Sequence, residues 1–196
     1  MAIPSAAQFT DVMPWPGRPG YAPTMAADDP IYRPTAWHLA TERLVLNPYD
    51  ATDTELFAEL LCERGPGARG FGTTVQGTRD NVAKSATNAN ESGMGMLAVR
   101  RRTEGDFIGC CGLLVGRASI DEPEIAFELL RRARGQGYAT EAAVAVIEVA
   151  KATGRRRLWS TVRAGNHPSF RVLEKTGFRW DHTDDEGDLV YLIRDL

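Results

Sequence analysis

Cysteine and histidine are scarce in this 196-residue chain, which has three of each. Cys62 stands alone and Cys110 adjoins Cys111, so the sequence shows neither an even disulfide framework nor a metal-ligand spacing. The adjacent pair lies in an apolar run, which predicts buried strand thiols in a reducing compartment. We therefore expect no disulfide and no metal site.

Long apolar runs and an excess of charge are also missing. No segment reaches the roughly 18 apolar residues that a membrane span needs, and the N-terminus lacks a basic-then-apolar signal pattern. The formal net charge is −3, which argues against a general nucleic-acid binder. These absences predict a cytoplasmic protein that binds neither membrane nor nucleic acid.

Proline is distributed unevenly. Seven of the eleven prolines fall in residues 1–36, which show no sustained hydrophobic period and predict an irregular N-terminal arm. Hydrophobic residues make up 43% of the chain, enough for one sizeable core. We predict one domain over residues 37–196, with the arm as a candidate docking segment in a homodimer or on another partner.

Beyond the arm, apolar periodicity predicts strands and helices in turn. "HLATERLVLNPY" alternates as a strand, and Asp53 caps a helix that ends near Arg64. A glycine-rich loop follows at 65–72, and a polar helix at about 78–91. "GMGMLAVRR" and "FIGCCGLLVG" predict a β-hairpin that turns at Gly105.

The second half of the chain continues the alternation. "PEIAFELL" and "RRLWSTV" are strand patterns, and "FRWDHT" with "LVYLIRDL" predicts a last hairpin. A short helix covers "HPSFRVLEKTGF", and a longer one runs from Tyr138 to about Thr153. The longer helix has an apolar face made of Ala139, Ala142, Val146, Ile147 and Ala150. The order predicts an α/β chain around a mixed sheet.

Glycine and arginine gather just before the longer helix, in "RRARGQGYATEA". A phosphate loop needs a lysine after its second glycine, but Gly137 is followed by Tyr138. A dinucleotide fingerprint needs a third glycine where Thr140 stands. A tight turn leading into a helix N-terminus fits better, because its N–H groups can hold a pyrophosphate while Arg132 and Arg134 add charge.

The run R-x-x-G-x-G from Arg132 to Gly137 resembles the acetyl-CoA pyrophosphate signature of the GNAT superfamily of N-acetyltransferases. Three segments, "TERLVLNPYDATD", "EIAFELLRRARGQGYATEA" and "NHPSFRVLEKTGF", are similar to its RimJ/RimL-like ribosomal-protein N-terminal acetyltransferase branch. The likeness spans about residues 41–178. It implies a mixed, mostly antiparallel twisted sheet of about seven strands flanked by helices.

The resemblance also implies where acetyl-CoA binds. The backbone of Leu129 and Leu130 would contact the pantetheine arm. Asn166 matches a family asparagine that hydrogen-bonds this arm, and it alternatively caps the following helix. The pyrophosphate would be wrapped by Gly135, Gln136, Gly137, Tyr138, Ala139 and Thr140.

The implied reaction is transfer of the acetyl group to a primary amine by direct attack, the acceptor being a protein N-terminus, a lysine or a small amine. Such an amine is mostly protonated at pH 7, so a base must take a proton. Glu124, which matches a family glutamate, and Glu128, which replaces an aromatic residue, share a strand face where each can raise the pKa of the other. Asp181 and His182 are further candidates by position.

The departing thiolate needs an acid or a hydrogen-bond donor. Many family members use a tyrosine where this chain has Leu173. Ser169 is the available hydroxyl, and its alternative role is to cap the helix. A second function stays open at this point: a non-catalytic acyl-CoA-binding or regulatory module of the same fold.

Overall fold

A computed structural model describes residues 38–49, 53–64 and 94–196. Three expected features lie outside these residues: the arm at 1–36, the glycine-rich loop at 65–72 and the polar helix at about 78–91. The described helices and strands are, in chain order, β1 (Leu39–Ala40), β2 (Leu44–Pro48), α1 (Thr54–Cys62), β3 (Met96–Arg101), β4 (Phe107–Leu114), β5 (Glu124–Leu129), α3 (Tyr138–Ala152), β6 (Arg157–Arg163), α4 (His167–Lys175), β7 (Arg179–Thr183) and β8 (Leu189–Asp195).

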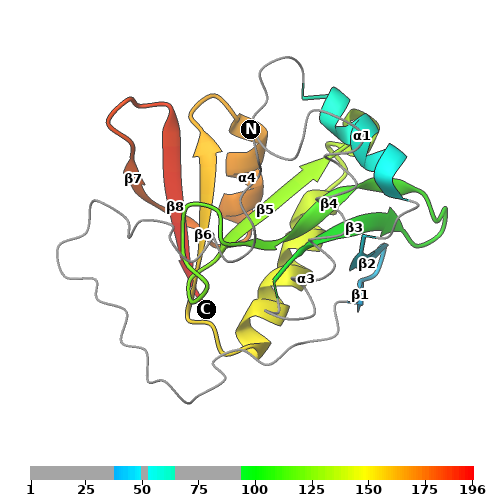
Figure 1. Cartoon of the computed structure of the whole chain (residues 1–196), viewed down its shortest axis with the longest axis horizontal. Helices are drawn as coiled ribbons and strands as arrows, with labels where there is room; N and C mark the ends of the chain where they lie inside the picture. Colours follow the sequence, from blue (N-terminus) through cyan, green and yellow to red (C-terminus); the bar gives the residue numbers. More distant parts are fainter. Residues whose placement is uncertain (1–37, 50–52, 65–93) are drawn as a thin grey trace, which may run out of the picture.

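The strands form one sheet in the order β1-β2-β3-β4-β5-β6-β8-β7 (Figure 1). Every neighbouring pair is antiparallel except β5 and β6, so the predicted mixed, mostly antiparallel sheet is confirmed. The sheet has eight described strands where the sequence indicated about seven. The difference arises because residues 38–49 fold into two short strands around a bend, where the N–H of Thr41 donates to the Leu44 carbonyl oxygen at 2.9 Å.

Asp53 stands directly before α1, as the sequence predicted. Its side chain makes no capping hydrogen bond to the helix and pairs with the guanidinium of Arg100 in β3 instead. The residue is only 2% exposed, so the ion pair compensates a buried charge. The cap prediction is right in position and wrong in its contact.

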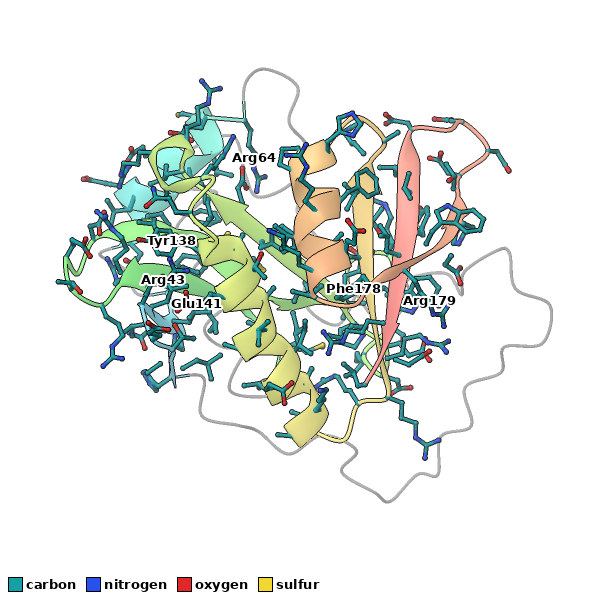
Figure 2. The ribbon with its side chains drawn as sticks, turned by 180° about the vertical axis from the view of Figure 1, so that it is seen from behind. Arg43, Arg64, Tyr138, Glu141, Phe178 and Arg179 are labelled. Carbon is teal, nitrogen blue, oxygen red and sulfur yellow. The ribbon has the colours of Figure 1, made fainter. Side chains whose placement is uncertain are left out.

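Two clusters of apolar side chains pack on the two faces of the sheet. One cluster joins β2–β6 to α3 and α4, with Val146, Ile147 and Leu173 among its buried members. The other joins β3 and β4 to α1 through Phe57 and Leu60. Figure 2, seen from behind, shows α3 and α4 lying side by side over the strands. The predicted apolar face of α3 is confirmed, except that Ala139 is half-buried and Ala143 is buried.

The sheet opens between β5 and β6. Their one registered pair is Glu124 with Trp159, next to a hydrogen bond from the Trp159 N–H to the Pro123 carbonyl oxygen at 2.9 Å. From this shared end the two strands diverge (Figure 1). The part of β5 beyond its start therefore lacks a ladder partner on the β6 side among the described residues.

Gly112 lets β3 and β4 approach closely at the centre of the sheet. A Cβ atom at this position would lie 2.7 Å from the Cα of Met96 and would overlap the carbonyl oxygen of Gly95. Because both obstacles are backbone atoms, one in β3 and one in the residue before it, neither can rotate away as a side chain would. The residue is fixed by packing rather than by turn geometry.

We expect Gly112→Ala to lower the free energy of unfolding by about 3 kcal/mol, because overpacking a core forces backbone shifts. Denaturant unfolding followed by circular dichroism measures the change. Gly165→Ala is the matched control, since a Cβ atom there meets nothing within 4 Å. The control should change stability by less than about 0.5 kcal/mol. Equal effects of the two substitutions would contradict the packing argument.

Candidate active site

The chain turns sharply between β5 and α3. A single 3₁₀ turn, Arg131–Ala133, follows β5, and Arg134 returns to extended backbone. Gly135 and Gly137 have φ angles of 78° and 84°, in the left-handed region that favours glycine. α3 begins at Tyr138, and the N–H groups of a first helical turn have no acceptor inside the helix. The turn therefore presents bare backbone and free helix amides together, as an anion site requires.

The two arginines predicted to add charge here are tied to other groups. Arg132 donates to the carboxylate of Glu59 at 2.9 Å and to the carbonyl oxygen of Phe107 at 2.8 Å. The Nε of Arg134 donates to the carbonyl oxygen of Leu129 at 2.8 Å. The two side chains thus tie the turn to α1, β4 and the end of β5. Arg134, which is half exposed, stays beside the end of β5.

The open edge of β5 is set by strand alternation. The hydroxyl of Ser160 in β6 donates to the carbonyl oxygen of Ile125 at 3.3 Å, so the backbone of Ile125 faces β6. Because a strand residue directs its N–H and C=O to the same side, Phe127 and Leu129 share this edge. The N–H of Leu130 instead donates to Ile108 of β4 at 2.9 Å. The structure therefore places Leu130 away from the open edge and adds Phe127, which the alternation of "EIAFEL" could have identified.

α4 is the second helix on this face of the sheet. It contains Ser169 and Leu173, and Asn166 stands directly before it. Asn166 is the N-cap, and its side-chain oxygen accepts a long hydrogen bond, 3.4 Å, from the N–H of Ser169. The capping role considered for Asn166 is therefore present in the structure. Ser169 is half-buried, whereas Leu173 is fully buried in the core. The hydroxyl nearest the start of α4 thus belongs to Ser169. Leu173, which stands where many family members have a tyrosine, packs into the core.

Glu124 is buried where β5 and β6 meet. One carboxylate oxygen accepts from the hydroxyl of Thr161 at 2.8 Å and from the N–H of Arg117 at 3.0 Å. The other lies against Gly116, where a Cβ atom would come within 2.5 Å of it. Burial raises the pKa of Glu124, and the two hydrogen bonds act in the opposite direction. The principal cause of the raised pKa is therefore burial, and not repulsion by Glu128 as the sequence suggested.

The other candidate bases have partners of their own. Both Nε and NH2 of Arg64 donate to one oxygen of Glu128, the former at 2.6 Å. The Nδ1 of His182 lies 2.8 Å from the carboxylate of Asp181, and its ring stacks on Tyr191 at 4.3 Å. Among the four candidates, Glu124 alone is deeply buried and, within the described residues, forms no ion pair.

Two parts of the site were missed by sequence reasoning. Thr161 faces Glu124 from the neighbouring strand, and Arg43 with Glu141 forms a cluster beside the start of α3. Arg43 and Glu141 are 98 positions apart. No local pattern links residues at such separations, so only the fold shows that they meet.

Two of the three thiols are buried in the sheet. Cys110 and Cys111 are buried and free, as predicted, and Cys62 is exposed and free. Burial raises the pKa of Cys110 to about 12 and also raises that of Cys111, which makes both poor nucleophiles. In the described ranges, no three His, Cys, Asp or Glu side chains are grouped to hold a metal ion. No helix of that part of the chain is long and apolar enough to cross a membrane.

Comparison with known proteins identifies the same architecture. The model of the acetyltransferase (GNAT) domain family matches residues 43–179. The uncharacterized protein YkkB of Bacillus subtilis is 33% identical over 108 residues, which cover 54% of this chain and 63% of YkkB. The chain thus matches less than two thirds of that relative.

Solved structures at low identity share the fold. A GNAT-family acetyltransferase from Bordetella pertussis has a TM-score of 0.69 at 24% identity, covering 80% of this chain and 98% of the other. RimJ of Mycobacterium smegmatis, solved in complex with CoA-disulfide, has a TM-score of 0.63 at 19% identity, covering 78% and 81%. The predicted fold class is therefore confirmed.

The burial of Glu124 predicts a pH-dependent stability. Because its pKa is higher folded than unfolded, its contribution is fully present below the ordinary glutamate pKa and is lost as pH rises through the folded pKa. We expect the stability of Glu124→Gln, relative to wild type, to increase as pH rises from about 4.5 to 8, since glutamine cannot ionise. Denaturant midpoints at several pH values measure this.

The matched control is Glu186→Gln, which changes an exposed glutamate in the β7–β8 turn. Its stability difference from wild type should stay flat over the same pH range. A flat difference for Glu124→Gln as well would show that burial does not disfavour the Glu124 carboxylate.

Proposed function

Because the chain belongs to the acetyltransferase (GNAT) domain family, we propose that it is an N-acetyltransferase that moves an acetyl group from acetyl-CoA to a primary amine. The observation that carries the proposal is the parting of β5 and β6 beside the glycine turn at the start of α3. This arrangement offers an open strand edge and a helix N-terminus to one elongated ligand. It requires no metal ion.

The described residues fit coenzyme A in chemistry and in place. The edge of β5 at Phe127 and Leu129 can pair with the amide groups of an extended pantetheine arm, as a strand edge pairs with a peptide. A Cβ atom at Gly135 would meet nothing within 4 Å, so that side of the turn is open to a ligand. The pyrophosphate then lies on the turn and the first-turn amides, contributed by Gln136, Gly137, Tyr138, Ala139 and Thr140. Asn166 stands at the N-terminus of α4 and can donate its side-chain amide to the arm.

Acetyl-CoA supplies a thioester whose carbonyl carbon forms the new C–N bond while the C–S bond breaks and leaves its electron pair on sulfur. We assign Glu124 to accept the proton that the acceptor ammonium must lose. Its raised pKa makes it a better base than an ordinary exposed carboxylate. The nitrogen gives up a second proton as the C–S bond breaks, and the departing sulfur takes it to leave as the CoA thiol. Ser169 donates a hydrogen bond to that sulfur from the start of α4. Glu128 is a weaker candidate base because Arg64 already binds its carboxylate.

The resemblance of the motifs to the ribosomal-protein branch favours a protein N-terminus as the acceptor. Peptides with free N-termini are therefore the first acceptors to test, before lysine and small amines. The alternative function, a non-catalytic acyl-CoA-binding or regulatory module, shares the coenzyme A site and differs in lacking turnover. The two are separated by measuring binding and turnover on the same protein.

Titration calorimetry of the full chain should show binding of acetyl-CoA and CoA, and no binding of ATP or NADH. Addition of peptides with free N-termini should then release thiol and add one acetyl group to the peptide, detected by mass. The same peptides with blocked N-termini are the matched controls and should release none. Binding without turnover on any amine would support the non-catalytic module. Absence of binding would rule out both the acetyltransferase and the non-catalytic module.

The role of Glu124 can be tested through Thr161. Removing the hydroxyl in Thr161→Val takes away a hydrogen bond that lowers the pKa of Glu124, so this pKa should rise further. The ascending limb of the kcat/KM profile should therefore move to higher pH, while Thr161→Ser should keep the wild-type profile. Glu124→Gln should lower kcat by about 100-fold or more and abolish the limb, with CoA affinity unchanged. An unshifted limb in Thr161→Val would remove Glu124 from this role.

A further inference from the structure

Glu141 places a carboxylate in the first turn of α3, beside the proposed anion site. Its N–H donates to the carbonyl oxygen of Gly137 at 3.1 Å, so it belongs to the first turn of the helix. A negative charge at a helix N-terminus stabilises the helix but also repels an anionic ligand at the same end. The chain therefore carries, next to its proposed pyrophosphate site, a group that opposes pyrophosphate binding.

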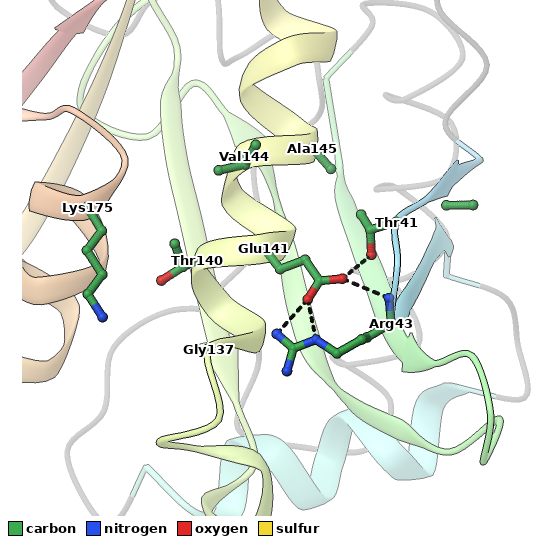
Figure 3. A pocket seen from close by; sticks show the side chains of 9 residues that line it. Thr41, Arg43, Gly137, Thr140, Glu141, Val144, Ala145 and Lys175 are labelled. Carbon is green, nitrogen blue, oxygen red and sulfur yellow. Dashed lines mark hydrogen bonds and ion pairs between the residues drawn. The ribbon is translucent and has the colours of Figure 1, made fainter.

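Two residues from the bend between β1 and β2 bind this carboxylate. The hydroxyl of Thr41 donates to one of its oxygens at 2.5 Å, and the N–H of Arg43 to the same oxygen at 2.9 Å. The Nε and NH2 of Arg43 lie 2.7 and 2.6 Å from the other oxygen. Figure 3 shows the Glu141 side chain turned toward both residues. We call this group of three residues, Thr41, Arg43 and Glu141, the clasp.

The clasp keeps Glu141 both ionised and neutralised. Burial alone would raise the pKa of Glu141, but the hydrogen bonds from Thr41 and Arg43 prevail and lower it. Two guanidinium nitrogens of Arg43 converge on one oxygen, and the Thr41 hydroxyl with the Arg43 N–H holds the other, which fixes the carboxylate in one orientation. The negative charge therefore faces the β1–β2 bend.

Arg43 also contacts the turn itself. Its NH1 donates to the carbonyl oxygen of Gln136 at 3.0 Å, and its guanidinium lies 4.6 Å from the ring centre of Tyr138. A Cβ atom on Gly137 would lie 3.4 Å from its NH2. One side chain thus reaches three successive residues, Gln136, Gly137 and Tyr138. Figure 2 labels Arg43 near Tyr138 and Glu141.

The clasp borders open surface. Its three residues line a groove of about 600 Å³ that also includes Gly137 and Thr140 of the proposed pyrophosphate site. Lys175 of α4 lines the same groove from the other helix (Figure 3). A charge released from the clasp would therefore act on a ligand at the start of α3, with little protein between them.

We propose that Arg43 is a positioning residue for the pyrophosphate of coenzyme A. It cancels the charge of Glu141 and holds the backbone from Gln136 to Tyr138, so that the first-turn amides remain available to the anion. The inference rests on the proposed function, because it needs a coenzyme A site at this turn. It assigns to Arg43 no contact with the ligand.

Calorimetric titration of CoA into a set of variants tests the charge argument. Arg43→Met leaves Glu141 uncompensated and should weaken binding about tenfold, the size of a strong charge effect at a helix end. Glu141→Gln removes the repulsion and should bind CoA as tightly as wild type or more tightly. The double variant should recover to within about threefold of wild type. The loss in Arg43→Met should shrink at high salt, since screening weakens exposed charge repulsion.

A purely structural role for Arg43 gives a different pattern. In that case the double variant binds CoA as weakly as Arg43→Met, and this result would overturn the proposal. Arg43→Lys keeps the charge but loses the paired Nε and NH2 contacts, so it should retain affinity within about threefold while lowering the melting temperature. Affinity as weak as that of Arg43→Met would also overturn the proposal.

The matched control is Arg102→Met. Arg102 donates to the Thr41 carbonyl oxygen at 2.8 Å from an exposed position and contacts neither Glu141 nor the turn in the described structure. Its removal should leave the CoA affinity unchanged. Failure of the wild-type chain to bind CoA would refute the proposed function, whereas normal wild-type binding without the variant pattern would refute the role of Arg43 alone.

Discussion

The single registered pair between β5 and β6, Glu124 with Trp159, is the constraint on which the site depends. Parallel strands pair evenly along their length when nothing separates them. Here the backbone ladder stops after its first pair. The next contact is a hydrogen bond from the Ser160 hydroxyl to the Ile125 carbonyl oxygen, and the strands then diverge. The divergence exposes one edge of β5 and brings that edge to the turn before α3. A fully zipped sheet would have neither an open edge nor a junction at which Glu124 is buried.

The charged side chains on the two sides of this junction differ in whether they have a partner of opposite charge. On the α3 side, Arg132 and Glu141 are each bound by a group of opposite charge. The helix amides are left as the principal attraction for an anion, and these attract through fixed dipoles rather than mobile side chains. On the α1 side, Glu124 is held by a hydroxyl and a backbone N–H, which keep it in place without neutralising it. The proposed role of Glu124 as a base depends on this environment, because burial without a paired cation raises its pKa.

Much of this could be predicted from sequence because it depends on local patterns. The hairpin at Gly105, the start of α3 and the glycine turn follow from turn chemistry and periodicity over a few residues. The misplaced details are the ones that depend on distant partners. Asp53 pairs with Arg100 instead of its own helix, and Leu130 pairs with β4. No spacing rule reveals either partner, because both come from strands that reach these residues only after folding.

Glu128 shows how a substitution at one position changes what the site can hold. The family pattern has an aromatic residue there, and an aromatic ring would offer the acceptor an apolar wall. This chain instead presents a carboxylate whose two donor contacts from Arg64 fall on a single oxygen. Within the described residues, the other oxygen accepts no hydrogen bond. At this point the proposed acceptor pocket therefore carries the ion pair of Glu128 with Arg64 in place of an apolar wall.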